Sequence, residues 1–272
     1  MVLFNGRLLR LLRSLAMTYY VMTQLSGLFW FILMLVPLII LQRLLHREIQ
    51  AVFLILTRDP RITMAVFSFI FLPGVFLHEL SHFIMAKLLG VRTGRFSLLP
   101  QSLPDGRLQL GYVETTRSDI VRDSLIGAAP LIVGTLFVAY VAIYHFEMRV
   151  LWDVLRNGQL NLFWMGIRAL PGVGDFYLWF YLVFAVSSTM MPSESDRHAW
   201  LELVISVAVL LTITLLLGAG PWMMSNLAPR ISNFFGFVAT IFGLSNLVHT
   251  LLILPTALIH KLVARATGVD IK

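Results

Sequence analysis

The sequence ITMAVFSFIFLPGVFLHELSHFIMAKLL, residues 62–89, is an apolar run that carries two histidines and a glutamate close to its end. About 20 apolar residues suffice for a helix to cross a bilayer, and this run is longer. Ionisable side chains are costly inside hydrocarbon, so those found there are usually paired, bound to a metal ion or facing water. The run therefore predicts a membrane-spanning helix that contains a polar site.

Within this run, His78 and His82 are one helical turn apart, which is the spacing of the HExxH pattern. Both imidazoles share one face of the helix, so they can bind the same metal ion. Glu79 projects about 100° around the helix, where its carboxylate can act as a base on a water molecule instead of binding the metal. The arrangement predicts a metal-dependent hydrolase. The alternative is that the three side chains only hydrogen-bond a neighbouring helix and stabilise the bundle.

The composition of the whole chain agrees with a membrane location. Of its 272 residues, 58% are hydrophobic and 13% are charged, which predicts a polytopic membrane protein. The net charge of +7 does not indicate nucleic-acid binding, because the basic residues flank apolar runs and form no basic module interleaved with aromatic residues. Because cysteine is absent, disulfides, cysteine-bound zinc and thiol nucleophiles are excluded, and any metal must be held by histidine and carboxylate.

No internal repeat or long polar linker divides the chain, so we expect one membrane-embedded domain over residues 1–272, of the all-α class with about six transmembrane helices. Residues 1–15 place arginines on one face and leucines on the other, which is typical of an interfacial amphipathic helix. A core of three helices is expected in residues 62–197, with C-terminal helices in residues 198–272. A short surface helix is expected within residues 42–61. The predicted spans are residues 16–41, 62–89, 120–144, 176–191, 200–217 and 234–259.

The longest polar stretch follows the histidine-containing span and predicts a small β-hairpin. Residues 107–114 largely alternate between polar and apolar, and the turn signal Pro104-Asp105-Gly106 separates them from residues 94–99. A hairpin beside a catalytic site can offer an edge strand to an extended peptide. The alternative is that it is only a connection between two spans.

A catalytic zinc usually takes three protein ligands and a water, so the two histidines need a partner from elsewhere in the chain. The second and fourth predicted spans run in the same direction, so their C-terminal ends share one side of the membrane. This favours the polar cluster after the fourth span over Asp175 at its start. Asp196 is the preferred third ligand, and Glu194 and His198 are the alternatives.

The distribution of basic residues predicts an orientation. With six spans, more of the lysines and arginines lie on the side of the N-terminus than on the other side. Because cytoplasmic segments carry an excess of these residues, we expect the N-terminus and the metal site on the cytoplasmic side. A bacterial-type cytoplasmic membrane is the default location.

These residues resemble the site-2 protease family of intramembrane zinc metalloproteases over the second to fourth spans. His78-Glu79-Leu80-Ser81-His82 matches the HExxH of that family, and Gly127-Ala128-Ala129-Pro130 resembles the small-residue motif of its intervening core helix. Pro192 and Asp196 stand where the family has a proline and its aspartate ligand. The resemblance implies one zinc ion per chain held by His78, His82 and Asp196, with Glu79 as catalytic base.

The resemblance also implies a function: hydrolysis of a peptide bond within or near the transmembrane segment of a membrane-protein substrate, such as a membrane-tethered regulator. The expected partners are this substrate and the lipid bilayer, with no nucleic acid. Four residues are candidates for substrate binding, namely Ser188, Leu108, Leu110 and Tyr112.

The chain departs from the family pattern in three ways. Arg197, not glycine, follows Asp196; Ser188 stands where the family has an asparagine; and the motif in the third span lacks its usual asparagine. There is also no room for a PDZ domain, so the resemblance implies a compact, divergent member. The alternative function is a catalytically inactive, site-2-protease-like scaffold or a subunit of a larger membrane complex.

Overall fold

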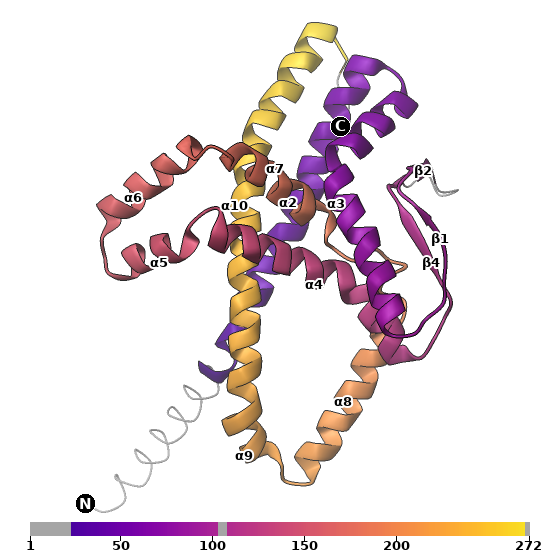
Figure 1. The fold of residues 1–272 in the computed structure, drawn as a ribbon, viewed down its shortest axis with the longest axis vertical. Coiled ribbons are helices and arrows are strands. Elements are labelled where there is room, and N and C mark those ends of the chain that lie inside the picture. Colours follow the sequence, from indigo (N-terminus) through magenta and orange to yellow (C-terminus); the bar gives the residue numbers. More distant parts are fainter. Residues whose placement is uncertain (1–22, 103–107, 270–272) are drawn as a thin grey trace, which may run out of the picture. The chain divides into compact units, whose positions relative to one another are not determined.

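The computed structural model describes residues 23–102 and 108–269, and these are largely helical (Figure 1). The interfacial helix expected in residues 1–15 lies outside the described residues. The elements are, in order, α2 (Ser26–Thr57), α3 (Pro60–Leu88), β1 (Thr93–Ser97), β2 (Gln101–Ser102), β3 (Leu108–Gln109), β4 (Tyr112–Thr115), α4 (Ile120–Tyr144), α5 (Met148–Arg156), α6 (Leu160–Ala169), the 3₁₀ turn η1 (Leu170–Gly172), α7 (Phe176–Thr189), α8 (Trp200–Leu216), α9 (Gly220–Trp222), the π-helical turn η2 (Met223–Leu227) and α10 (Ala228–Thr267).

Four of the described helical segments are long and apolar enough to cross a membrane: α2, α3, α4 and the continuous stretch Gly220–Thr267 that ends in α10. A fifth crossing is available if Leu160–Gly172 and α7, which are bent by 95° relative to each other, form one broken span. These helices agree with the prediction of a polytopic, largely α-helical membrane protein. Among the described residues the count is four or five, so the predicted six spans are not confirmed; α8, which covers most of the predicted span 200–217, has 17 residues.

The first long helix extends further than the sequence suggested. The predicted span ends at residue 41 because Arg43 and Arg47 follow, yet α2 continues to Thr57 without a break. Both arginines point away from the packed face, while Leu45 beside them is fully buried. The separate surface helix expected within residues 42–61 is therefore wrong, since residues 42–57 are the last part of α2 and α3 begins at Pro60.

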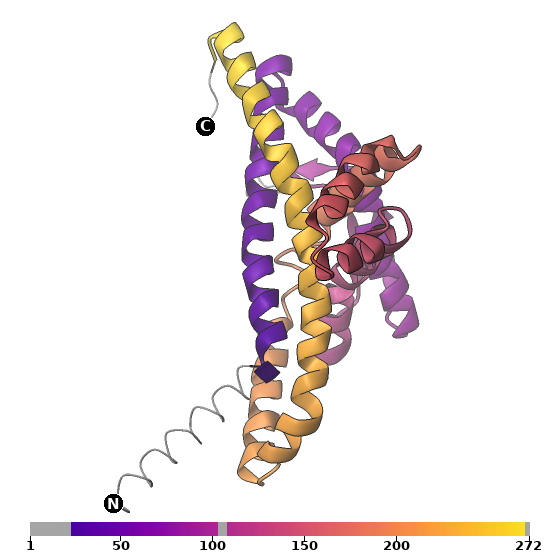
Figure 2. The same ribbon diagram turned by 90° about the vertical axis from the view of Figure 1, so that its left-hand side faces the viewer.

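The described residues form two compact units: the chain up to Pro37 with Ile205–Gly243, and Leu38–Val204 with Leu244–Lys272. In the first unit, α2 and α10 lie side by side and run in the same direction (Figure 2). The N–H of Gly27 donates to Ser232 Oγ over 2.9 Å, and one turn further along both helices Phe31 packs on Phe235. A Cβ on Gly27 would overlap the Ser232 carbonyl, so glycine permits this close approach.

In the second unit, α3 packs against both α4 and α7, which also pack against each other. Asp59 begins α3 by accepting the N–H of Arg61, and Pro60 follows at the first helical position, where its missing N–H has no cost. Further along, a Cβ on Gly74 would overlap the Ala185 carbonyl of α7. The small residue therefore lets α3 and α7 meet with their backbones almost in contact.

Pro73 lies inside α3 and removes a hydrogen bond from the helix. The hydroxyl of Tyr181, on α7, donates to the carbonyl of Ile70 over 2.8 Å. A neighbouring helix thus satisfies a carbonyl in the turn that the proline loosens, as membrane helices require. Gly74, the next residue, brings α7 close to α3 one turn before His78.

In the order of the chain, the strands follow α3 and precede α4. β1 pairs antiparallel with β4, Ser97 opposite Tyr112 and Thr93 opposite Thr115, with an irregularity in the register between them; β2 pairs with β3. β4 also packs against α3. A Cβ on Gly111, just before β4, would lie 2.9 Å from Glu79 Cγ. This glycine therefore lets the start of β4 approach the glutamate of the histidine motif.

Candidate metal centre

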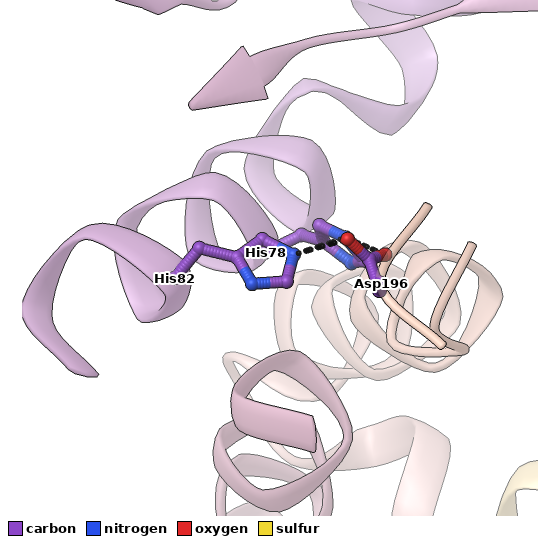
Figure 3. A group of neighbouring side chains, drawn as sticks. All are labelled: His78, His82 and Asp196. Carbon is purple, nitrogen blue, oxygen red and sulfur yellow. Dashed lines mark hydrogen bonds and ion pairs between the residues drawn. The ribbon is translucent and has the colours of Figure 1, made fainter. Parts of the chain in front are cut away.

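Three side chains converge where α3 meets the loop after α7. Figure 3 shows His78 and His82 on successive turns of α3, with Asp196 reaching toward both imidazoles. The Nε2 atoms of the two histidines are 3.2 Å apart. Asp196 Oδ2 lies 3.7 Å from His78 Nε2, and its Oδ1 lies 3.3 Å from His82 Nε2. One ligand atom from each residue lies within 4.8 Å of the others.

Backbone carbonyls determine which nitrogen of each imidazole faces this centre. The Nδ1 of His78 lies 2.6 Å from the carbonyl oxygen of Thr189, and the Nδ1 of His82 lies 2.8 Å from that of Ile126. A carbonyl oxygen only accepts, so both Nδ1 atoms carry a proton and donate it. In the neutral rings, both Nε2 atoms then direct a lone pair at the centre. This second contact, which fixes the tautomer, is typical of metal-binding histidines.

The donor set fits a metal ion. Two imidazole lone pairs and one carboxylate within 4.8 Å repel one another unless a cation lies among them. Two histidines and a carboxylate are a usual ligand set for a catalytic zinc, which keeps its fourth position open. The residues therefore form a group that can hold a metal ion.

Asp196 is suited to bind a cation because its carboxylate is ionised. Burial raises the pKa of this carboxyl, but its contacts with His78 and His82, and the hydrogen bond from the N–H of Ser193, lower it more strongly. The net pKa lies below the ordinary value for aspartate, so Asp196 carries its negative charge at neutral pH.

The loop that carries Asp196 is held against the start of α4. The Cα of Gly127 lies against the Asp196 carbonyl so closely that a Cβ would overlap it. Ser124 Oγ donates to the carbonyl of Ala199 over 3.4 Å, and His198 Nε2 lies 3.3 Å from Asp123 Oδ2. Gly127 therefore permits the close approach of this loop to α4.

A cavity of about 540 Å³ opens onto the three ligands and onto Glu79. Glu79 is 7% exposed and lines the same cavity as His78, His82 and Asp196. Leu110 and Tyr112 line the cavity as well, as does Ser188. Of the residues predicted to bind substrate, only Leu108 is not placed, because its side chain lies outside the described part of the structure.

The other sequence candidates lie elsewhere. Among the described residues, the metal-binding group contains Asp196 but neither Glu194 nor His198, which only line the cavity. His198 contacts Asp123 and the Ser195 carbonyl instead. Asp175 precedes α7 and accepts a hydrogen bond from the Trp179 indole at the opposite end of that helix.

Sequence reasoning missed two titratable residues of the cavity, Asp123 and His46. Asp123 had a weak signal, since it lies in the first turn of a predicted span, where acidic residues are common. His46 had none, because a single histidine among leucines and arginines has no characteristic spacing. No family model, no curated protein and no solved structure matches this chain.

Proposed function

We propose that this protein is a zinc-dependent endopeptidase that cuts membrane-protein substrates within or near their transmembrane segments. The observation that carries the proposal is that His78 and His82, on a helix long enough to span a membrane, converge with Asp196 beside Glu79. A structural metal site would have no use for a carboxylate base next to an open cavity. The chain's resemblance in sequence motifs to site-2 proteases supports the same reaction.

In this proposal, His78, His82 and Asp196 hold the zinc ion. Zinc bound there supplies Lewis-acid polarisation of the substrate carbonyl and lowers the pKa of water. Glu79 accepts a proton from the attacking water and passes it to the leaving amine as the peptide bond breaks. Its low exposure keeps bulk water away from the carboxylate, and Gly111 leaves the space that its side chain needs.

The substrate must be extended at the site, because a helix engages its carbonyls in its own hydrogen bonds. We propose that β4 holds this extended segment by strand pairing. The position of β4 against α3, with Leu110 and Tyr112 beside the cavity, supports this role. The substrate class is then a membrane protein whose single span can be locally unwound.

We further propose five membrane spans: α2, α3, α4, the bent pair of α6 and α7, and α10. This count makes α2 and α10 cross in the same direction, in agreement with the parallel contacts of Gly27 with Ser232 and Phe31 with Phe235. Adding α8 as a sixth span would make them antiparallel. The five-span count also moves Lys261 and Arg265 away from the side of the N-terminus, which removes the charge excess behind the predicted orientation.

The proposal is tested first by metal content. Elemental analysis of detergent-purified protein should give about one zinc per chain, and less in both His82→Ala and Asp196→Asn. Glu194→Gln is the matched control, since it changes a carboxylate that lines the cavity outside the ligand group and should retain the metal. If Asp196→Asn keeps its zinc, the ligand set is wrong. Well-folded wild type without metal, copurifying with a stable partner, would favour the scaffold instead.

A further inference from the structure

The cavity has polar residues that the proposed chemistry does not use. His46 comes from α2, and Ser188 and Thr189 come from the end of α7. All three belong to the unit that contains the metal-binding group. A substrate segment that unwinds inside a membrane exposes carbonyls that lipid cannot satisfy, so the protein must supply hydrogen-bond donors for them.

The hydroxyl groups of Ser188 and Thr189 are not available as donors to a substrate. His249 is fully buried and its Nδ1 lies 2.7 Å from the carbonyl oxygen of Ser245, so Nδ1 carries the proton. Both hydrogen-bond partners of this ring are uncharged, so the ring is neutral and its Nε2 accepts. Ser188 Oγ, 3.0 Å from that Nε2, therefore donates its proton to His249. The hydroxyl of Thr189 donates to the Ala185 carbonyl over 3.0 Å.

His46 differs from these residues. Its ring packs edge-on against Phe67 and Phe71 of α3, with centroid distances of 5.3 and 4.8 Å. Its Nε2 is buried and has no hydrogen-bond partner among the described residues. A buried polar atom without a partner destabilises a fold, so one beside a cavity indicates a contact that a ligand completes.

The position of His46 along α3 indicates which part of a substrate it meets. Phe71 precedes His78 by seven residues, which is about 10 Å along a helix axis. An extended peptide advances about 3.3 Å per residue, so this distance corresponds to about three residues. A peptide that leaves the metal centre along α3, toward the apolar middle of the helix, would bring a carbonyl to His46.

We propose that His46 binds the substrate by donating a hydrogen bond from Nε2 to a main-chain carbonyl about three residues from the bond that is cut. This role rests on the proposed function and deepens it, since His46 would let the site accept a segment unwound inside the bilayer. The contact is to the backbone, so it selects for an extended conformation and not for a particular side chain.

The test measures binding, not cleavage. The full-length protein, with zinc and with Glu79→Gln to prevent turnover, is titrated against a fluorescein-labelled peptide with one apolar span of about 20 residues and a central Asn-Gly pair. Fluorescence anisotropy gives Kd.

His46→Phe keeps the aromatic packing and should weaken binding about tenfold, the effect of one lost hydrogen bond. His46→Gln keeps a donor and should stay within about threefold of the parent protein. Phe67→Leu changes the same packing without touching a donor, so its Kd should also stay within about threefold of that of the parent protein.

Equal binding by His46→Phe and the parent protein would overturn this role and leave the proposed function intact. Equally weak binding by His46→Gln and His46→Phe would also overturn it, because donation would then not be the cause. Loss of zinc in His46→Phe would identify a structural role instead. If the zinc-loaded parent bound no peptide at all, the proposed function itself would fail, and this inference with it.

Discussion

Gly127 positions the third ligand because it has no side chain. Its Cα lies against the carbonyl of Asp196, at a distance that no residue with a Cβ can reach. The contact holds the loop after α7 against α4, and with it the carboxylate that faces His78 and His82. Metal binding should therefore also depend on a position that is not one of the proposed ligands.

Gly127→Ala should lower zinc affinity by about tenfold or more, because a shift of a residue that positions ligands typically has this effect. Zinc affinity is measured by competition with a chelator of known affinity. Gly172→Ala is the control, since nothing lies within 4 Å of a Cβ built there. Unchanged zinc affinity in Gly127→Ala would mean that the loop does not need this contact.

Glu79→Gln should reduce cleavage of a single-span substrate by about 100-fold or more, the contribution of a general base, while the zinc content stays at the wild-type level. The measurement is the initial rate of cleavage beside elemental analysis of the same preparation. Glu147→Gln alters an exposed glutamate before α5 and should be as active as wild type. Wild-type cleavage rates in Glu79→Gln would contradict the proposed mechanism.

At the scale of elements, the metal-binding group depends on how the loop between α7 and α8 is attached to α4. His198 reaches Asp123 across 3.3 Å, and Asp123 also accepts the N–H of Ser118 over 3.1 Å. Asp123 thus joins the loop to the segment that precedes α4. The loop carries the only ligand that does not lie on α3.

Asp123→Ala should therefore weaken zinc binding by about tenfold without changing any ligand. Chelator competition provides the measurement, and circular dichroism confirms that the helices are retained. Asp153→Ala removes an exposed aspartate from α5 and should leave zinc affinity unchanged. If both variants bind zinc as wild type does, the contact between His198 and Asp123 has no part in holding the loop.

The sequence was sufficient where the geometry is local. The one-turn spacing of His78 and His82 requires only that the segment is helical, and the direction of successive spans brought Asp196 to the same end of the molecule. The sequence was insufficient where packing between distant parts of the chain determines the structure. The arginines after residue 41 suggested an end to the first span, but α2 continues because Arg43 and Arg47 are exposed. His46 is part of the cavity only through the packing of α2 on α3, which leaves no pattern in the sequence.

At the scale of the whole molecule, the parallel contacts between α2 and α10 limit the ways in which the chain can cross a membrane. Gly27 and Phe31 of α2 meet Ser232 and Phe235 of α10 in the same order along both helices. An even number of crossings in sequence, with α2 first and α10 last, would make these helices antiparallel. Hydrophobicity alone would not distinguish an odd from an even number of crossings, since α8 is as hydrophobic as the longer helices.

Single-cysteine labelling tests the five-span count, and the absence of native cysteine makes the chain ready for it. Arg117→Cys, before α4, and Val269→Cys, after α10, should react with a membrane-impermeant maleimide from opposite sides of sealed vesicles. Disrupted vesicles, in which both variants should react, are the control. Reaction of both from the same side would contradict five spans and support an even number of crossings.

The carbonyls of Ile126 and Thr189, which hold the two imidazoles, have a consequence for biosynthesis. They are supplied 44 and 111 residues after the histidines that they contact. While the ribosome is still translating the region in between, α3 can already be in the membrane, but its histidines lack these partners and the carboxylate of Asp196. Under the proposed function, the nascent chain would remain inactive toward the membrane proteins inserted beside it until Asp196 had been made.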